Sequence, residues 1–343
     1  MPYIFILLIN GLLLALSNSL KIKYFYYLAA ISLIIFSGMR ISGMDYESYN
    51  FIYDSIKSNN YQEYIDPINL AIIKLGFIIS DSNKIIFLIY SAITVFSVIF
   101  FIDRNSSNKE LSLYIFMTFG LYYLSTFNII RQWLAIAILL IGFNFLLEKK
   151  YLYLYFIICI ASIIHLSALI FIFMPFFNRR YKLKNLLFIL IMSPVLIYLI
   201  FQLIGISSYV HYLNEDFIFT ADDPILRPTT LFYLLFNIFI VWKLKYFQKA
   251  HHLDEKIIIF LNMCIASSLI IILFYFMGFD FQILMRANVY FTIQYIILIP
   301  ILIRILSKKH NYIFNYVFIV LLSLNFIFSI YFNGESQKLL PYN

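Results

Sequence analysis

Apolar runs of about 17 to 25 residues, the length that a helix needs to cross a bilayer, follow one another along almost the whole chain. The polar stretches between them are too short to fold on their own. Of the 343 residues, 63% are hydrophobic and 12% are charged, and the mean hydropathy is +0.89. A soluble domain carries roughly twice that share of charge. We therefore expect an all-α integral membrane protein in which residues 1–343 form a single membrane domain.

Most of the chain divides readily into membrane spans. The windows that fit are residues 3–19, 24–39, 84–102, 111–127, 132–147, 185–205, 229–247, 256–277, 287–303 and 313–332. Residues 151–177 are too long for one span and too short for two ordinary ones, so we expect a hairpin of two short helices broken near His165. Residues 67–80 begin at Pro67 and carry Lys74, a charge that is costly in hydrocarbon, so we expect a re-entrant or interfacial helix. The result is a polytopic helical bundle of about 12 membrane segments plus that helix.

The basic residues set the orientation, because Lys and Arg near span ends concentrate in cytoplasmic loops. In this layout 17 of the 25 Lys and Arg residues lie in cytoplasmic loops, and 12 of the 17 acidic residues lie outside. Both termini then face outward, and the outer loops 40–66, 206–228 and 278–286 form the expected active-site face. The net charge of +8 reflects this topology and anionic lipid headgroups, so we expect contact with the lipid bilayer and no nucleic acid.

The first group of candidate residues lies just beyond the second span, at Arg40, Asp45, Tyr46 and Tyr49. Polar residues that remain on the outer face are where function is to be sought. The alternative is a loop with a snorkelling arginine and solvated carboxylates.

The second group surrounds Arg131. The apolar stretch 111–147 has no Gly or Pro loop between its two spans, so Arg131 and Gln132 should lie at or below the outer membrane surface. A charge held there needs a partner or an anionic ligand. We expect one helical turn to bring Asn128 beside them. Simple snorkelling of Arg131 is the alternative.

A histidine and two further arginines complete the set. His165 lies inside an apolar run, where a hydrogen-bonded core role competes with catalysis; the helix break favours catalysis because irregular backbone at membrane depth lines cavities. Arg286 opens a span from the outside, and Arg227 lies in the loop 206–228. Arginines that converge on an outer cavity suit a lipid-linked phosphate or diphosphate, since guanidinium pairs bidentately with phosphate oxygens. We expect no metal and no other cofactor, because no nucleotide-binding, zinc-binding or serine-nucleophile motif is present.

Four short motifs follow one another in order along the chain. They are Arg40 with DYESY at 45–49, FNIIRQWLA at 127–135, IIHLSAL at 163–169 and RANVYF at 286–291, and Asp66 followed by Pro67 extends the first of them. In this ordered set the chain resembles the EpsG family of bacterial membrane proteins, which is related to the Wzy-type O-antigen and capsule polymerases.

The resemblance implies a GT-C-like glycosyltransferase in the bacterial cytoplasmic membrane. Such an enzyme extends an O-antigen, capsule or exopolysaccharide from repeat units linked to polyprenyl (undecaprenyl) diphosphate, with a chain-length regulator and a flippase as partners. In that reaction we expect Arg131 to stabilise the diphosphate and His165 or Asp45 to act as general base. The expected substrate-binding residues are Arg40, Tyr46, Tyr49, Asn128, Gln132, Arg227, Arg286 and Tyr290.

Two other classes of protein compete with this interpretation. A flippase or exporter of lipid-linked oligosaccharide also needs an arginine-rich cavity, but its charges should run across the depth of the membrane, whereas here they gather on one side. A non-catalytic membrane component of a polysaccharide assembly complex needs none of these residues individually. Tolerance of substitution at Arg131 and His165 distinguishes that component from an enzyme.

Overall fold

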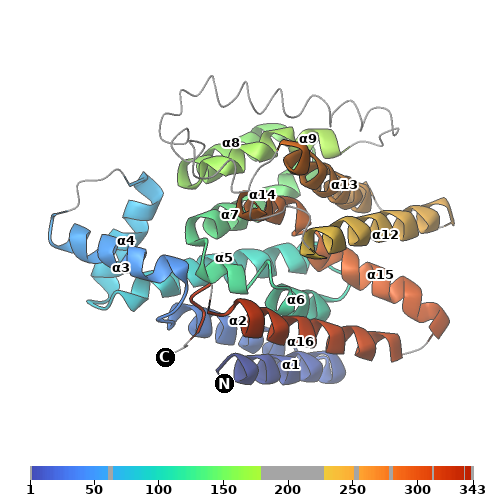
Figure 1. Cartoon of the computed structure of the whole chain (residues 1–343), viewed down its shortest axis with the longest axis horizontal. Helices are drawn as coiled ribbons and strands as arrows, with labels where there is room; N and C mark the ends of the chain where they lie inside the picture. The colour runs from blue at the N-terminus through green and yellow to red at the C-terminus, as the bar shows by residue number, and fades with distance from the viewer. Residues whose placement is uncertain are drawn as a thin grey trace. The chain divides into compact units, whose positions relative to one another are not determined.

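The computed structural model describes residues 2–60, 65–178, 228–250, 255–277, 281–310, 313–335 and 337–340. Within these ranges every regular element is a helix, as predicted (Figure 1). The chain divides into two compact units, unit 1 (Met1–Phe173 and Tyr295–Asn343) and unit 2 (Met174–Gln294). The span predicted at 185–205 lies outside the described residues.

Unit 1 holds most of the helices. They are α1 (Pro2–Leu20), α2 (Lys23–Gly38), α3 (Met44–Lys57), α4 (Pro67–Ile79), α5 (Lys84–Asn105), α6 (Lys109–Thr118), η1 (Leu124–Phe127), α7 (Ile130–Leu147), α8 (Tyr151–Ile164), η2 (Leu166–Phe173), α15 (Tyr295–His310) and α16 (Ile313–Asn333), where η marks a 3-10 helix. Unit 2 contains α9 (Met174–Phe177), α12 (Pro228–Ala250), α13 (Glu255–Met277) and α14 (Phe281–Thr292). In unit 1, α1 packs on α2 and α6, and α6 packs on α15 and α16 (Figure 1).

Among the described residues, three helices are long and apolar enough to cross a membrane by themselves: α1, α5 and α7. The broken pair Met285–Thr292 and Tyr295–Leu306 makes a fourth if it counts as one span. Several other apolar helices are shorter, among them α2, α4 and α8. These helices are those of a membrane protein, and the number of twelve segments stays a prediction.

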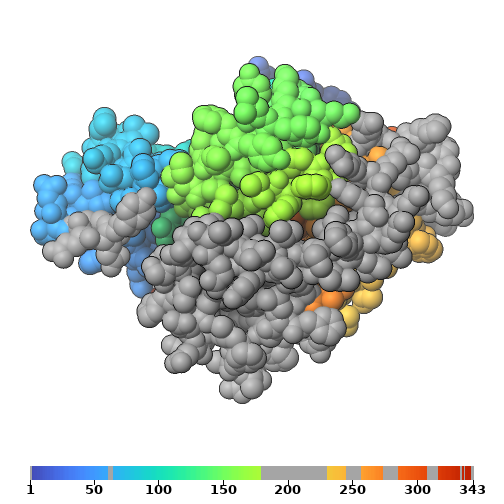
Figure 2. Space-filling view, turned by 90° about the horizontal axis from the view of Figure 1, so that it is seen from above, coloured from blue at the N-terminus to red at the C-terminus, as the bar shows by residue number. Residues whose placement is uncertain are grey.

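Residues 39–60 and 65–87 lie together at one end of unit 1, which we call the α3 end. Helix α2 ends at Gly38, and α5 begins at Lys84. Gly38 packs so closely on α5 that a Cβ atom added to Gly38 would lie 2.7 Å from the Cα atom of Leu88. The chain between α2 and α5 therefore leaves the helical bundle and re-enters it at the same end. Helix α4 is one of the shorter apolar helices, and Lys74 on it is exposed; that residues 67–80 do not cross the membrane stays a prediction. The side chains of α3 and α4, in blue and cyan, stand at the left of the face shown in Figure 2.

The ends of other helices fall on the sides that the sequence predicts relative to one another. The hydroxyl of Tyr3, at the start of α1, donates to the carbonyl oxygen of Leu339 (3.0 Å), and both lie at the α3 end. At the opposite end, Ser17 Oγ donates to Glu110 Oε1 (2.9 Å), which joins the end of α1 to the start of α6. Which of the two ends faces the cytoplasm stays a prediction.

The prediction of one continuous span over residues 111–127 is wrong. Helix α6 ends at Thr118 after ten residues, and turns and η1 follow. The carbonyl oxygen of Thr118 accepts a hydrogen bond from Asn325 Nδ2 (3.2 Å), and Tyr123 donates through its hydroxyl to the carbonyl oxygen of Leu33 (2.7 Å). The Asn325 side chain thus supplies a partner to a carbonyl oxygen at the break, and the Tyr123 bond fixes the turn to α2. Hydropathy does not reveal such a break, because the polar partners come from α2 and α16, far away in sequence.

A second break interrupts the span predicted at 287–303. Helix α14 ends at Thr292, a turn follows at residues 293–294, and α15 begins at Tyr295. The prediction of one unbroken helix is therefore wrong here as well. By contrast, the break predicted near His165 is confirmed, since α8 ends at Ile164 and the chain continues as η2.

Candidate functional site

The site is built around the first turn of α7, where Asp45 meets the helix. Asp45 lies in the first turn of α3, and its Oδ2 accepts a hydrogen bond from the backbone N–H of Ile130 (2.9 Å), the first residue of α7. The first amides of a helix have no partner inside it, and its N-terminal end favours negative charge. One carboxylate therefore joins α3 to α7 beside Arg131.

Arg131 reaches the surface from this first turn, and its side chain is exposed. It interacts electrostatically with two carboxylates, Asp45 and Asp66, and with two phenols, Tyr49 and Tyr90. These groups come from α3, from the N-cap of α4 and from α5. Acidic and phenolic groups from three helices thus lie near the positive charge of Arg131, whose side chain reaches the surface.

Tyr49 is a buried neighbour of Arg131. Its ring is buried, lies edge-on to Tyr90 (5.7 Å between centroids) and packs beside Phe87. Burial raises the pKa of the Tyr49 hydroxyl above its ordinary value, and the charge of Arg131 opposes that rise. The phenol is therefore neutral at physiological pH.

Asp66 belongs to this site, although the sequence did not single it out as a functional residue. Its carboxylate caps α4, accepting bonds from the backbone N–H of Asn69 (3.0 Å) and from Asn69 Nδ2 (2.5 Å). The hydroxyl of Tyr90 donates to Asn69 Oδ1. A buried chain of hydrogen bonds thus leads from α5 to the carboxylate that faces Arg131. Asp before Pro is a helix N-cap signal in the sequence, whereas nothing marks Tyr90 within its apolar span.

Arg40 has a different environment from that of Arg131. Its side chain is 2% exposed, and its Nη1 donates to the carbonyl oxygen (2.9 Å) and the hydroxyl (2.8 Å) of Ser37. Its Nη2 donates to the carbonyl oxygen of Thr126 (3.4 Å), and the guanidinium lies over the rings of Phe127 (4.4 Å) and Phe87 (5.1 Å). These contacts tie the end of α2 to η1 and α5.

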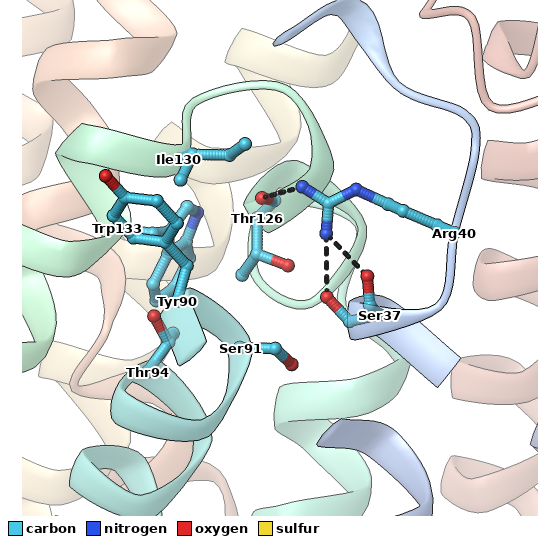
Figure 3. A pocket seen from close by; sticks show the side chains of 8 residues that line it. All are labelled: Ser37, Arg40, Tyr90, Ser91, Thr94, Thr126, Ile130 and Trp133. Carbon is cyan, nitrogen blue, oxygen red and sulfur yellow. Dashed lines mark hydrogen bonds between the residues drawn. The ribbon is translucent and has the colours of Figure 1, made fainter. Parts of the chain in front are cut away.

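Arg40 also lines a small cavity (Figure 3). Hydroxyl groups of Ser91 and Thr94 contribute to its wall, together with Tyr90 and Ile130. The space that the centre of a water molecule can occupy is about 10 Å³, which is room for about one water. The cavity is too small for a phosphate group, and the substrate-binding role of Arg40 stays a prediction.

The prediction that a helical turn brings Asn128 beside Arg131 is wrong. Asn128 precedes α7, and its carboxamide connects two other segments. Its Oδ1 accepts from the backbone N–H of Met44 (3.0 Å), and its Nδ2 donates to Gln337 Oε1 (3.4 Å). The helix begins only at Ile130, and Ile129 before it has φ −133° and ψ 59°, outside the helical region, so the spacing of three residues does not correspond to a turn.

The remaining predicted residues of unit 1 are divided between buried and partly exposed positions. Tyr46 stacks on Phe87 (5.0 Å, 24°), and Gln132 is buried in α7. His165 is partly buried at the end of α8, with its Nδ1 2.6 Å from Ser167 Oγ. The structure therefore groups Asp45 and Tyr49 with Arg131, and it places His165 at the helix break.

The predicted residues of unit 2 are described by themselves. Arg286 has an exposed side chain on α14, and Tyr290 is buried one turn further along the same helix. Arg227 lies outside the described residues. Across the parts of the chain that the structure describes, no three His, Cys, Asp or Glu side chains come together in a way that could hold a metal ion.

These features define the class: a helical membrane protein with an exposed arginine near two carboxylates at one end of unit 1. A family model matches residues 23–343, and the chain belongs to the EpsG family. Membership of this family indicates a polysaccharide polymerase of exopolysaccharide assembly. Comparison with curated proteins and with solved structures gives no significant match.

Proposed function

We propose that the protein is a membrane glycosyltransferase that polymerises polyprenyl-diphosphate-linked repeat units into a surface polysaccharide at the outer face of the cytoplasmic membrane. The observation that carries the proposal is the exposed side chain of Arg131, with the charges of Asp45 and Asp66 near it, in a chain of the EpsG family. A GT-C-like arrangement of about 12 membrane segments belongs to the same proposal.

The reaction transfers the growing glycan from its carrier to the next lipid-linked repeat unit. A hydroxyl oxygen of the acceptor sugar forms a bond to the anomeric carbon of the donor, and the bond from that carbon to the phosphate oxygen breaks. The lipid diphosphate leaves with the electron pair, and the proton of the hydroxyl passes to a base. Arg131 stabilises the negative charge that grows on the leaving phosphate, an effect worth about 10²- to 10³-fold in rate for one donor in other enzymes.

The carboxylates serve this step by fixing the guanidinium in place. Asp45 already accepts a hydrogen bond from the N–H of Ile130, so we assign it to positioning Arg131. We assign the role of base to His165, whose unperturbed pKa lies near neutrality. The contact between its Nδ1 and Ser167 orients the ring, and Nε2 is the nitrogen that takes the proton.

Further contacts to the substrates complete the proposal. Tyr46 offers an aromatic ring to a sugar at the α3 end, and Arg286 of unit 2 stays a predicted substrate-binding residue that we consider by itself. The repeat units come from a flippase, and a chain-length regulator sets the length of the product.

The test is the length of the polysaccharide in a strain that lacks this gene. The strain is complemented with the wild-type chain, Arg131→Ala or His165→Ala, and protein levels in the membrane are measured by immunoblot. Lys74→Ala is the matched control, because Lys74 is an exposed cation of the same α3 end that lies outside the site. We expect only single repeat units on the carrier with either site variant, and long chains with the control.

The other outcomes reject parts of the proposal. Long chains with Arg131→Ala remove Arg131 from its role, and long chains with His165→Ala remove the base. Long chains in the empty deletion strain reject polymerase activity altogether. Repeat units that accumulate on the cytoplasmic side, measured by their accessibility in inverted vesicles, indicate a flippase instead.

A further inference from the structure

Residues 337–340, which follow α16, are built into the α3 end of unit 1. The backbone N–H of Gly43 donates to the carbonyl oxygen of Lys338 (2.6 Å), and the hydroxyl of Tyr3 donates to that of Leu339 (3.0 Å). The side chain of Leu339 is completely buried. The segment is therefore part of the packed structure and not a loose extension of α16.

A defined turn brings the segment back from the end of α16. The backbone N–H of Leu339 donates to the carbonyl oxygen of Gly334 (2.7 Å), and that of Lys338 donates to Glu335 (3.0 Å). Lys338 has a φ of +50°, in the left-handed region. A Cβ atom on Gly334 would lie 2.2 Å from the backbone carbonyl oxygen of Ile330, so the turn depends on a glycine there.

The segment meets the two parts of the chain that hold Asp45 and Arg131. Gly43, the residue before α3, has a φ of +107°, and a Cβ atom there would lie 2.5 Å from the carbonyl oxygen of Phe127. Asn128 binds the backbone of Met44 and also donates to Gln337. The links therefore fall within two residues of Asp45 on one side and within three of Arg131 on the other.

We infer that residues 337–340 act as a positioning element for the Arg131 site. By holding the residues before α3 against the turn before α7, they keep the carboxylate of Asp45 on the N–H of Ile130 and beside Arg131. The effect on polymerisation rests on the proposed function, whereas the effect on the backbone does not. The backbone bonds carry the role, because the ion pair between Lys338 Nζ and Glu47 (3.0 Å) is exposed and such pairs contribute little.

The experiment uses Lys338→Pro in the full chain, reconstituted in nanodiscs. Proline fixes φ near about −65° and has no N–H, so it is incompatible both with the φ of Lys338 and with its bond to Glu335. We expect amide hydrogen exchange at residues 43–46 to become about fivefold faster, as loss of a hydrogen bond of about 1 kcal/mol implies. Polymerisation by the same preparation should fall by a similar factor, with unchanged exchange in α5.

Two variants separate the backbone from the side chain. Lys338→Gly accepts the positive φ and should keep the slow exchange of the wild-type chain. Glu47→Gln removes only the exposed ion pair and should leave both exchange and polymerisation unchanged. If Glu47→Gln reproduces the effect of Lys338→Pro, the ion pair and not the backbone is responsible, and the inference is wrong.

The readouts distinguish failure of the inference from failure of the proposed function. Unchanged exchange at residues 43–46 in Lys338→Pro overturns the positioning role. Faster exchange at residues 43–46 together with full polymerisation by Lys338→Pro also overturns the positioning role. If the wild-type chain makes no polymer at all, the proposed function fails, while the exchange data still decide the backbone contact. If exchange in α5 also rises in Lys338→Pro, the variant Asn128→Ala decides. This variant removes the hydrogen bonds of Asn128 to Met44 and Gln337 without altering the turn after α16. Slow exchange at Met44 in Asn128→Ala overturns the inference.

Discussion

Arg40 and Arg131 lie at the same end of unit 1 and have Tyr90 as a common neighbour, yet their surroundings are opposite. Arg40 is buried, donates to the backbone of Ser37 and Thr126, and lies over two aromatic rings. Arg131 is exposed and faces the carboxylates of Asp45 and Asp66.

The difference shows how one residue type serves two purposes. The guanidinium of Arg40 donates hydrogen bonds to carbonyl oxygens near the end of α2 and in η1. Removing this side chain leaves buried acceptors without a donor and opens a cavity. The carboxylates around Arg131 orient it without covering it. Burial thus separates an arginine that maintains the fold from an arginine that can bind an anion.

The largest effect that this comparison predicts is on folding. Arg40→Ala should lower the free energy of unfolding by about 3 kcal/mol or more, because it leaves polar groups without partners and opens a cavity. Thermal unfolding in detergent, followed by size-exclusion chromatography, measures this loss. Arg131→Ala in the same assay should unfold close to the wild-type temperature. A stable Arg40→Ala chain that makes no polymer would move Arg40 from the fold into the site.

The next effect is on catalysis. Arg131→Lys keeps the charge but loses the planar pair of donors that fits a phosphate, so polymerisation should fall by about 10²-fold, or about 2.7 kcal/mol. Its initial rate is measured in proteoliposomes with a lipid-diphosphate-linked repeat unit. Full activity would show that Arg131 acts only as a point charge, and that its orientation by carboxylates is unimportant.

A smaller effect is expected at Asp66, which both caps α4 and faces Arg131. Asp66→Asn can still accept a bond at the start of α4 but no longer carries the charge that faces Arg131. We expect a loss of roughly tenfold in rate and of about 1 kcal/mol in stability. The same two assays measure both losses. A loss of stability alone would restrict Asp66 to its role as a helix cap.

Much of the fold could be predicted from sequence because it depends on local composition. Apolar runs locate α1, α5 and α7, and Asp66 with Pro67 marks the start of α4. The breaks after Thr118 and Thr292 could not be predicted in this way. At Thr118 the reason is visible, since its carbonyl oxygen is satisfied by Asn325 from another helix.

The site was predicted in part for the same reason. An arginine in an apolar stretch is unusual by itself, so Arg131 could be found, and Asp45 and Tyr49 stood out in a polar loop. Asp66 and Tyr90 acquire their roles only through packing of α4 and α5 against Arg131. Asn128 was assigned to a helical turn because its spacing fits one, although its carboxamide binds α3 and residue Gln337 instead.

The smallest effect concerns a charged pair that is neither buried nor in the site. Lys57 Nζ lies 2.9 Å from Asp81 Oδ1, and both side chains are open to solvent. The hydrogen bond from Lys57 lowers the pKa of the Asp81 carboxyl. Its stabilising effect is therefore present above the ordinary aspartate pKa of about 4 and is lost as the pH falls through the lowered value.

Asp81→Asn should consequently leave the unfolding temperature at neutral pH unchanged within error, because exposed ion pairs contribute little. Unfolding temperatures measured from about pH 6 to about pH 3 should fall slightly less in the variant than in the wild-type chain, since the variant has no carboxyl to protonate there. Asp81 has a direct ionic partner in Lys57, whereas the described hydrogen bonds of Arg40 go to neutral oxygens. If Asp81→Asn nevertheless destabilises the protein as much as Arg40→Ala does, burial does not order these residues, and the distinction drawn between Arg40 and Arg131 loses its physical basis.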